Sequence, residues 1–219
     1  MMPNSSAEKR VRIFCGWWIV LIRSYYAIYA AGIFYSGFST FVKPVAMELG
    51  WSMAMVSGAF SLYRLEAGVA SPIVGFLLVR IGPVKVVWAG ALLMGGGFIY
   101  LSRVSTILPF YMAVFIISFG WSGFAGIGMG NPLIGKWFVK MRGTALGIYG
   151  AARGLSGLLV PVVTYLIVQY GWRTALLILG PLTWLLVLPT AFMLKHSPER
   201  YGLLPDGDPL WQGTHFSAG

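Results

Sequence analysis

Long apolar runs separated by short polar connectors dominate this sequence. About twenty mostly apolar residues can cross a ~30 Å hydrocarbon layer as a helix, because every backbone amide then pairs inside the segment. Six runs approach this length, at residues 17–40, 56–79, 84–101, 108–129, 143–168 and 174–194. The pattern predicts an all-α, polytopic membrane protein with six transmembrane helices.

The connectors between the runs are short and contain helix-breaking residues, which leaves no room for a soluble domain. They include Lys43-Pro44, Ile81-Gly82-Pro83, Asn131-Pro132 and Tyr170-Gly171-Trp172. The first run has about 24 residues and is too long for an ordinary signal peptide, so we interpret it as a retained helix. We therefore expect a cytoplasmic amino-terminal segment (1–15), a six-helix bundle (16–195) and a cytoplasmic linker or tail (196–219).

The composition agrees with a membrane location. Hydrophobic residues make up 58% of the chain and charged residues 10%, whereas soluble domains are roughly half apolar and about a quarter charged. The net charge of +10 lies mostly in connectors rather than on one basic face. It therefore indicates membrane loops facing lipid headgroups, and no nucleic-acid partner.

Lysine and arginine gather on one side of the predicted bundle, and cytoplasmic loops retain this excess. We therefore expect a multi-pass protein of the inner (plasma) membrane with both termini in the cytoplasm. The richer side holds Lys9, Arg10, Arg12, Arg80, Lys85, Lys136, Lys140, Arg142, Lys195 and Arg200, and the other side holds Lys43, Arg103 and Arg173.

Four charged residues lie inside the apolar runs: Arg23, Arg64, Arg153 and Glu66. A charge at membrane depth costs several kcal/mol unless it meets a partner or a wet cavity, so each is a functional candidate. Arg23 lies about one and a half turns inside its run and either snorkels to the surface or joins a coupling or ion-pair network. Glu66 either pairs with an arginine of another helix or takes up a proton.

Helical spacing arranges further polar side chains around these charges. Tyr149, Arg153 and Ser156 share one stripe suited to a carboxylate, with Arg153 about ten residues, or ~15 Å, deep. Arg64 belongs to a second stripe, with Ser57, Ser61, Gly68 and Ser71, and Tyr29 to a third, with Tyr25, Gly32, Ser36 and Ser39. The candidate substrate-binding residues are thus Arg64, Arg153, Tyr29, Tyr149 and Ser156. The arginines could instead be wholly structural, and Tyr29 could pack with a satisfied hydroxyl.

Glycines form two further stripes at helical spacing, which allow helices to approach closely. One consists of Gly143, Gly147, Gly150, Gly154 and Gly157, and the other of Gly120, Gly123, Gly126 and Gly130. They indicate either sliding surfaces or tight static packing, and both interpretations require helix partners.

Motifs for catalysis or cofactor binding are missing from the apolar runs. They contain no histidine cluster, nucleophile–base set, metal-ligand spacing or phosphate-binding glycine–lysine loop. The sequence has a single cysteine, Cys15. We therefore expect no enzyme activity, no cofactor and no metal.

Several motifs resemble those of a transporter family. Gly75, Arg80, Gly82 and Lys85 match the signature loop of the major facilitator superfamily. The stretch from Lys136 to Ile148, Tyr170-Gly171-Trp172-Arg173 and the ending from Ser197 to Gly207 are similar to the oxalate/formate antiporter and monocarboxylate transporter branch.

This resemblance implies half of a twelve-helix facilitator fold, the amino-terminal half. It implies secondary active transport of small organic anions such as mono- or dicarboxylates, with a carboxy-terminal half or a second copy of the chain as partner. Alternatives are a transporter of neutral or cationic metabolites, a non-transporting membrane subunit, or a truncated fragment.

Overall fold

The computed structural model describes residues 15–194, apart from the side chains of Cys15, Ala67 and residues 127–130. These residues form helices and short connectors, with no strand among them, as the sequence predicts. The predicted segments 1–15 and 196–219 lie outside the described residues, except for Cys15. The elements are α1 (Cys15–Ala30), the π-helix η1 (Ala31–Ser36), α2 (Phe38–Leu49), α3 (Met53–Ile81), α4 (Pro83–Leu101), α5 (Ile107–Phe124), α6 (Ile127–Trp137), α7 (Arg142–Gly154), the 3₁₀-helix η2 (Leu155–Leu159) and α8 (Val160–Ala191).

Four helical stretches in the described part are long and apolar enough to cross a membrane, or five if the bent helix α3 counts as one span. The longest runs from Arg142 to Ala191, and its 50 residues would extend ~75 Å as one straight helix. Gly171 (φ 78°, ψ 157°) divides it into two helices, at the predicted connector. This division yields the six expected segments, while the number of membrane crossings stays a prediction.

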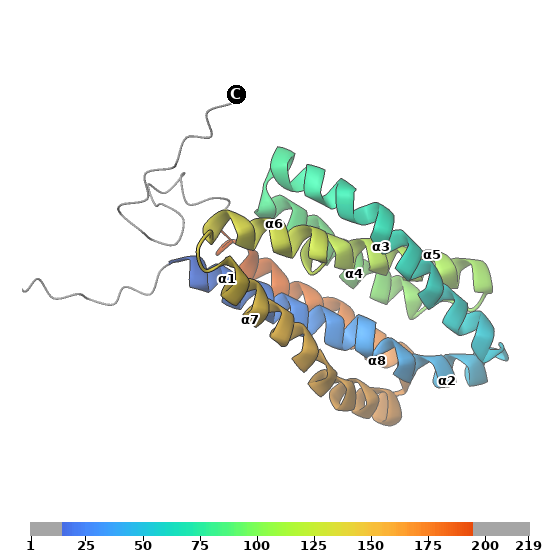
Figure 1. The fold of residues 1–219 in the computed structure, drawn as a ribbon. Coiled ribbons are helices and arrows are strands. Elements are labelled where there is room, and N and C mark those ends of the chain that lie inside the picture. Colours follow the sequence, from blue (N-terminus) through green and yellow to red (C-terminus); the bar gives the residue numbers. More distant parts are fainter. Residues whose placement is uncertain (1–14, 195–219) are drawn as a thin grey trace, which may run out of the picture.

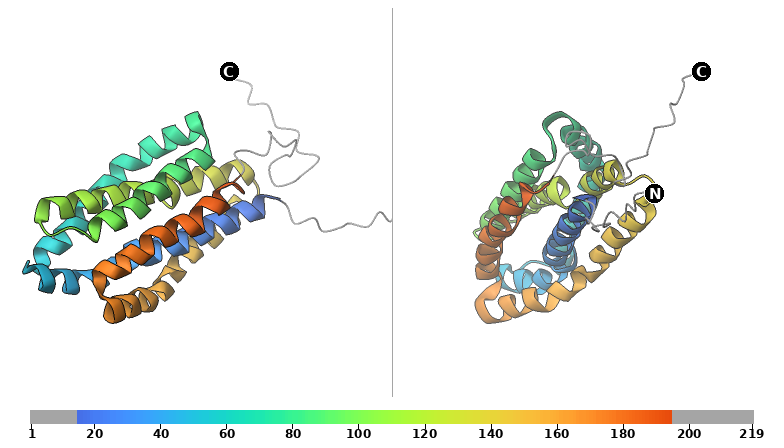
Figure 2. Two further views of the ribbon diagram at one scale, coloured as in Figure 1. Left: turned by 180° about the vertical axis from the view of Figure 1, so that it is seen from behind. Right: turned by 90° about the vertical axis from the view of Figure 1, so that its left-hand side faces the viewer.

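The helices lie roughly along one bundle axis (Figure 1). Helix α4 packs against α5 and α8, α3 against α5, and α1 against α7. The start of α1, the loop between α6 and α7 and the end of α8 all lie at one end of the bundle, which the view from behind also shows (Figure 2). The bundle therefore has the two-ended arrangement that the predicted sidedness needs.

Glycines bring α4 into close contact with its neighbours. A Cβ at Gly120 would lie 2.5 Å from the Met94 nitrogen and 2.7 Å from the Gly90 oxygen, and Gly123 also lies against Gly90. Gly95 and Gly180 make a similar contact between α4 and α8. Gly120 and Gly123, from the fourth apolar run, therefore allow tight static packing against α4.

The second glycine stripe has a different environment. At Gly143, Gly147, Gly150, Gly154 and Gly157 an added Cβ would meet nothing within 4 Å. This face of α7 and η2 is consequently uncovered by the described residues, and the static-packing alternative is not realised within this part of the chain.

Two predicted connectors are wrong. Lys43-Pro44 lies inside α2, and Asn131-Pro132 lies inside α6. A proline removes one backbone hydrogen bond, but packed membrane helices tolerate this loss. Helix α2 ends instead at Gly50, whose left-handed φ of 68° favours glycine.

Packing at Gly120 predicts a measurable difference between the two glycine stripes. Gly120→Ala should lower the free energy of unfolding by roughly 1–3 kcal/mol, because its methyl group overpacks the contact with α4. The control Gly150→Ala should leave stability unchanged or raise it by up to about 1 kcal/mol, through helix propensity. Unfolding of the purified chain in detergent measures both, and equal effects would contradict the assigned contact.

Candidate functional site

Four of the six segments are irregular near their middles. Segment 15–49 contains the π-helix η1, α3 bends by 45° between Glu66 and Gly68, segment 107–137 breaks between α5 and α6, and segment 142–170 contains the 3₁₀-helix η2. Helix α4, by contrast, is continuous. Discontinuous helices are typical of binding sites in secondary transporters, so these irregularities mark the candidate site.

The two irregular turns η1 and η2 contact each other directly. A Cβ at Gly32 would lie 2.7 Å from the Ser156 oxygen and 2.8 Å from the Leu159 side chain, so only glycine fits. The Ser36 and Ser156 hydroxyl oxygens are 3.3 Å apart. Ser156, a predicted substrate-binding residue, therefore has a partner inside the bundle.

Side chains of α1 and α7 bind the break between α5 and α6. Arg23 donates hydrogen bonds from Nη1 to the Phe124 oxygen and from Nη2 to the Gly126 oxygen, the latter at 3.5 Å. The Tyr149 hydroxyl donates to the Ala125 oxygen at 3.3 Å. Three successive carbonyl groups at this break thus have partners.

The expectation that Arg23 snorkels to the surface is wrong. Its exposed fraction is 0%, and its guanidinium lies 5.8 Å from the Tyr26 ring centroid and 5.9 Å from that of Tyr149. The helix-break carbonyl groups hold it inside, because they carry the partial negative charge of a helix end. Within the described residues it forms no ion pair, so the structure does not bring it together with Glu66.

Arg153 lies half-buried beside an aromatic pair. Its guanidinium is 5.7 Å from the Trp121 ring centroid, and the Trp121 and Tyr63 centroids are 5.4 Å apart. Two donors here, Arg153 Nη1 and Trp121 Nε1, are buried and have no hydrogen-bond partner in the described part of the chain. Unsatisfied buried donors are costly, so this place favours an acceptor such as a carboxylate.

Tyr63 also lies within electrostatic reach of three charged residues, Arg64, Glu66 and Arg153. We call these four residues, with Trp121, the Tyr63 cluster. Arg64 and Glu66 are neighbours of Tyr63 on α3, so Arg153 is the predicted charge that the fold brings to it from another helix. Sequence patterns did not single out Tyr63 or Trp121, because an aromatic residue in an apolar run has the same pattern as ordinary packing.

Glu66 is 6% exposed, and neither carboxylate oxygen has a hydrogen-bond partner among the described residues. The predicted ion pair with an arginine of a neighbouring helix is thus not formed. Arg64 is exposed on the opposite face of α3, as the spacing predicts, with its guanidinium 5.8 Å from the Phe60 ring centroid. The alternative in which Glu66 takes up a proton stays a hypothesis.

Phe60 also lines an open groove between the first segment and α3, with about 360 Å³ of empty volume. Tyr35, Ser39 and Ser57 contribute hydroxyl groups to its lining. Tyr35 was missing from the predicted polar stripe, because the π-turn η1 shifts the helical register within that stripe. The groove therefore places hydroxyl groups close to the Arg64 side of α3.

Tyr29 packs inside the bundle with a satisfied hydroxyl group, which is one of the two predicted alternatives. It is 5% exposed, and its hydroxyl lies 2.9 Å from that of Thr183 in α8. Tyr26 makes an equivalent contact of 2.9 Å with Thr190. These pairs tie α1 to the last segment, and the structure does not bring Tyr29 together with Arg153.

A second cavity, with about 370 Å³ of empty volume, is lined by hydrophobic side chains. They include Phe34, Phe38, Phe41, Phe98 and Phe110. No polar groups converge on it, so it does not have the chemistry of an anion site.

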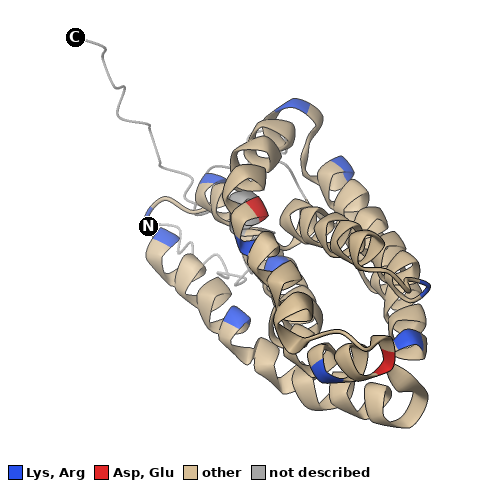
Figure 3. Cartoon of the chain, turned by 90° about the vertical axis from the view of Figure 1, so that its right-hand side faces the viewer, with Lys and Arg blue, Asp and Glu red and all other residues tan. Residues whose placement is uncertain are grey.

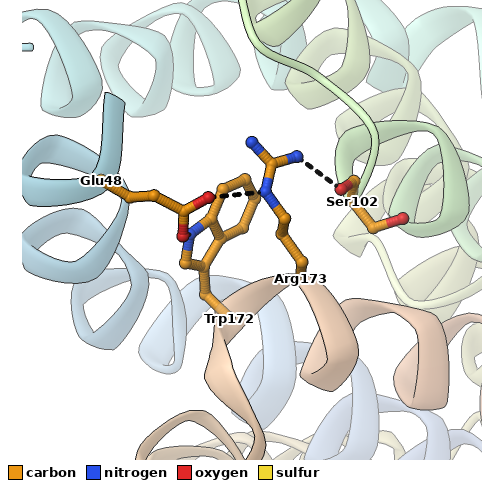
Figure 4. Close-up of polar contacts among 4 residues, drawn as sticks. All are labelled: Glu48, Ser102, Trp172 and Arg173. Atoms are coloured by element: carbon orange, nitrogen blue, oxygen red, sulfur yellow. Dashed lines mark hydrogen bonds and ion pairs between the residues drawn. The ribbon is translucent and has the colours of Figure 1, made fainter. Parts of the chain in front are cut away.

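One end of the bundle is held by a polar clamp that the sequence did not indicate (Figure 4). Glu48 accepts hydrogen bonds from Arg173 Nε at 2.7 Å and Trp172 Nε1 at 2.5 Å. Arg173 also donates to the Ser102 oxygen at 2.7 Å. The clamp joins α2, α8 and the end of α4. The only available signal was that the predicted topology put all four residues at one end of the bundle.

Positive charge dominates the bundle, where lysine and arginine clearly outnumber aspartate and glutamate (Figure 3). Glu48 is taken by the Arg173 clamp, so it does not neutralise the arginines at the middle of the bundle. The geometry therefore combines irregular helices with a positively charged Tyr63 cluster.

Comparison with known proteins gives the family. The sequence profile of the Major Facilitator Superfamily matches residues 25–214. The chain belongs to the major facilitator superfamily. It is thus a multi-pass, all-α membrane protein of a transporter family, and its relatives are transporters rather than enzymes.

Three relatives within the superfamily illustrate the range of substrates in their names. Human Monocarboxylate transporter 11 is 33% identical over 116 residues, covering 52% of this chain and 24% of the relative. Oxalate:formate antiporter of Oxalobacter formigenes is 24% identical over 186 residues, covering 84% and 44%. Probable hexose phosphate transport protein of Chlamydia pneumoniae is 26% identical over 196 residues, covering 84% and 41%. The chain spans less than half the length of these curated relatives.

The four residues that resemble the superfamily's signature loop lie at the junction of α3 and α4, where the loop is shorter than predicted. Gly75 and Arg80 lie inside α3, because no proline or further glycine interrupts the chain between Gly75 and Gly82. Arg80 lies 5.1 Å from the Phe76 ring centroid, and Lys85 is in the first turn of α4. Only Gly82 lies between the helices, at a φ of 85° that favours glycine.

Glu66 has no hydrogen-bond or ion-pair partner among the described residues of this facilitator chain, which predicts how the protein responds to its neutralisation. Glu66→Gln should leave the free energy of unfolding unchanged or raise it, since no partner is lost and a buried charge is removed. Loss of a buried ion pair would instead cost about 3–5 kcal/mol. Unfolding in detergent at pH 8 distinguishes these results. The control Glu48→Gln weakens the half-exposed clamp and should cost about 1 kcal/mol or less.

Proposed function

We propose that this chain forms the amino-terminal six-helix half of a secondary active transporter for small organic anions such as mono- or dicarboxylates. The observation that carries the proposal is the pair of unsatisfied buried donors, Arg153 Nη1 and Trp121 Nε1, in the Tyr63 cluster. In this proposal a substrate carboxylate accepts from both, and its charge complements the guanidinium.

Arg64 supports the same assignment from the open side of α3. It is exposed, and the groove beside Phe60 supplies hydroxyl groups from Tyr35, Ser39 and Ser57. In this proposal Arg153 neutralises the anion beside Trp121, and Arg64 adds positive charge from the groove side of α3. The anionic substrates in the names of the three relatives agree with this class of solute.

The residues of the original candidate set now have different roles in the proposal. Arg64 and Arg153 contact the substrate, whereas Tyr29, Tyr149 and Ser156 hold the helices through internal hydrogen bonds. Glu66 is the proposed proton acceptor of a symport cycle, because its carboxylate is buried near the cluster and has no partner within the described chain.

A second six-helix body completes the carrier in this proposal, either a carboxy-terminal half or a second copy of this chain. The uncovered glycine face of α7 and η2 and the exposed polar stripe of α3 are the surfaces that it would cover. Both termini then face the cytoplasm, as the distribution of lysine and arginine predicts.

Uptake by the assembled carrier in proteoliposomes tests the substrate class. Arg153→Gln should abolish uptake of labelled oxalate or lactate, because the amide cannot supply a charge-assisted bidentate contact. Trp121→Phe keeps the ring and removes one donor, so it should weaken apparent affinity about 10- to 150-fold, which corresponds to one hydrogen bond to a charged group.

Arg103→Gln, in the exposed loop before α5, is the matched control and should transport like the unchanged protein. Unchanged uptake by Arg153→Gln would remove this arginine from the site. Stronger competition by neutral sugars or organic cations than by carboxylates would favour the alternative class of solute.

A further inference from the structure

The break between α5 and α6 exposes backbone carbonyl groups near the middle of a membrane segment. The last carbonyl groups of an α-helix have no partner within the helix and carry about half a negative charge. In hydrocarbon, water is not present to satisfy them. The Phe124 oxygen at the end of α5 and the Ala125 oxygen in the break therefore need partners from elsewhere in the protein, whereas Gly126 is the N-cap residue of α6.

Arg23 meets this need with a matching shape and charge. Its two terminal nitrogens donate to the Phe124 and Gly126 oxygens, while Tyr149 donates to the Ala125 oxygen between them. A guanidinium presents donors in a planar fork, which suits two carbonyl groups better than the point charge of lysine. Helices α1 and α7 are thereby joined to the break.

The desolvation of Arg23 is offset without any carboxylate in the described chain. The rings of Tyr26 and Tyr149 lie near the guanidinium, at 5.8 and 5.9 Å, where cation–π attraction stabilises it. The partial charges of the carbonyl oxygens supply the remaining compensation. Only Nε remains without a hydrogen-bond partner.

We propose that Arg23 is a positioning residue whose guanidinium acts as a covalently attached cation for the carbonyl cluster of Phe124, Ala125 and Gly126. It fixes the angle between α5 and α6. Unwound carbonyl groups of this kind bind coupling cations in other secondary transporters. Here the protein's own cation occupies them, so this break is a structural joint rather than an ion site.

The angle between α5 and α6 can be measured on the chain itself, without transport. Cys15→Ser removes the native thiol, and cysteines replacing Met112 in α5 and Lys136 in α6 carry spin labels about 36 Å apart along the helical rise. Pulsed electron paramagnetic resonance in nanodiscs gives the distance distribution. A single narrow distribution is expected with Arg23 present.

Arg23→Ala should broaden or shift this distribution, and millimolar guanidinium chloride should restore it by entering the vacated site. Arg23→Met is the matched control: it fills the same space without charge, so it should show the broad distribution and no rescue. An Arg23→Ala distribution identical to that of the unchanged chain would overturn the proposal. So would equal responses of the alanine and methionine variants to guanidinium.

Arg23→Lys covers the case in which Arg23→Ala does not fold. Lysine keeps the charge and loses the fork, so an intermediate width is expected. A lysine variant with the original distribution would show that the guanidinium geometry is not needed. The measurement is independent of the transported solute, so failure of the anion proposal would leave its result unaffected.

Discussion

Backbone hydrogen bonding inside the bilayer is the constraint on which this structure depends. A regular helix satisfies it alone, but each interrupted helix leaves polar groups that need protein partners. Arg23 and Tyr149 serve the break between α5 and α6, and the serine hydroxyls of η1 and η2 face each other where these turns cross. Several polar residues within the apolar runs are therefore explained by backbone geometry before any solute is considered.

The three arginines at membrane depth consequently differ in whether their guanidinium groups remain free to bind a solute. The guanidinium of Arg23 is taken by the carbonyl groups of the helix break, and Arg64 lies exposed against Phe60. Arg153 keeps a buried donor unsatisfied beside Trp121, while Glu66 contributes no neutralising hydrogen bond in the described chain. The anion binding proposed for this superfamily member rests on this difference: carbonyl groups occupy the guanidinium of Arg23, whereas Arg153 keeps an unsatisfied donor.

The helices could be predicted from the sequence because apolar length and the glycines at 82 and 171 mark their extent. The prolines led to two wrongly predicted connectors, since Pro44 and Pro132 lie inside packed helices. Helical periodicity correctly placed Arg64 and Glu66 on opposite faces of their helix. It assumes a constant number of residues per turn, however, and the π-helix η1 changes that number near Tyr35. It also compares residues within one helix, so it could not reveal that Arg23 meets a carbonyl group 101 positions away.

The proposed site and the Arg23 joint both depend on the helices crossing a bilayer with their two ends on opposite sides. The most direct measurement is labelling of single cysteines with a membrane-impermeant maleimide, in a Cys15→Ser background. Cysteines at Lys85 and Lys136 should react only after the cells are permeabilised, and a cysteine at Tyr170 should react in intact cells. Reaction of Lys85 and Lys136 from opposite sides, or of Tyr170 from the same side as both, would contradict the account.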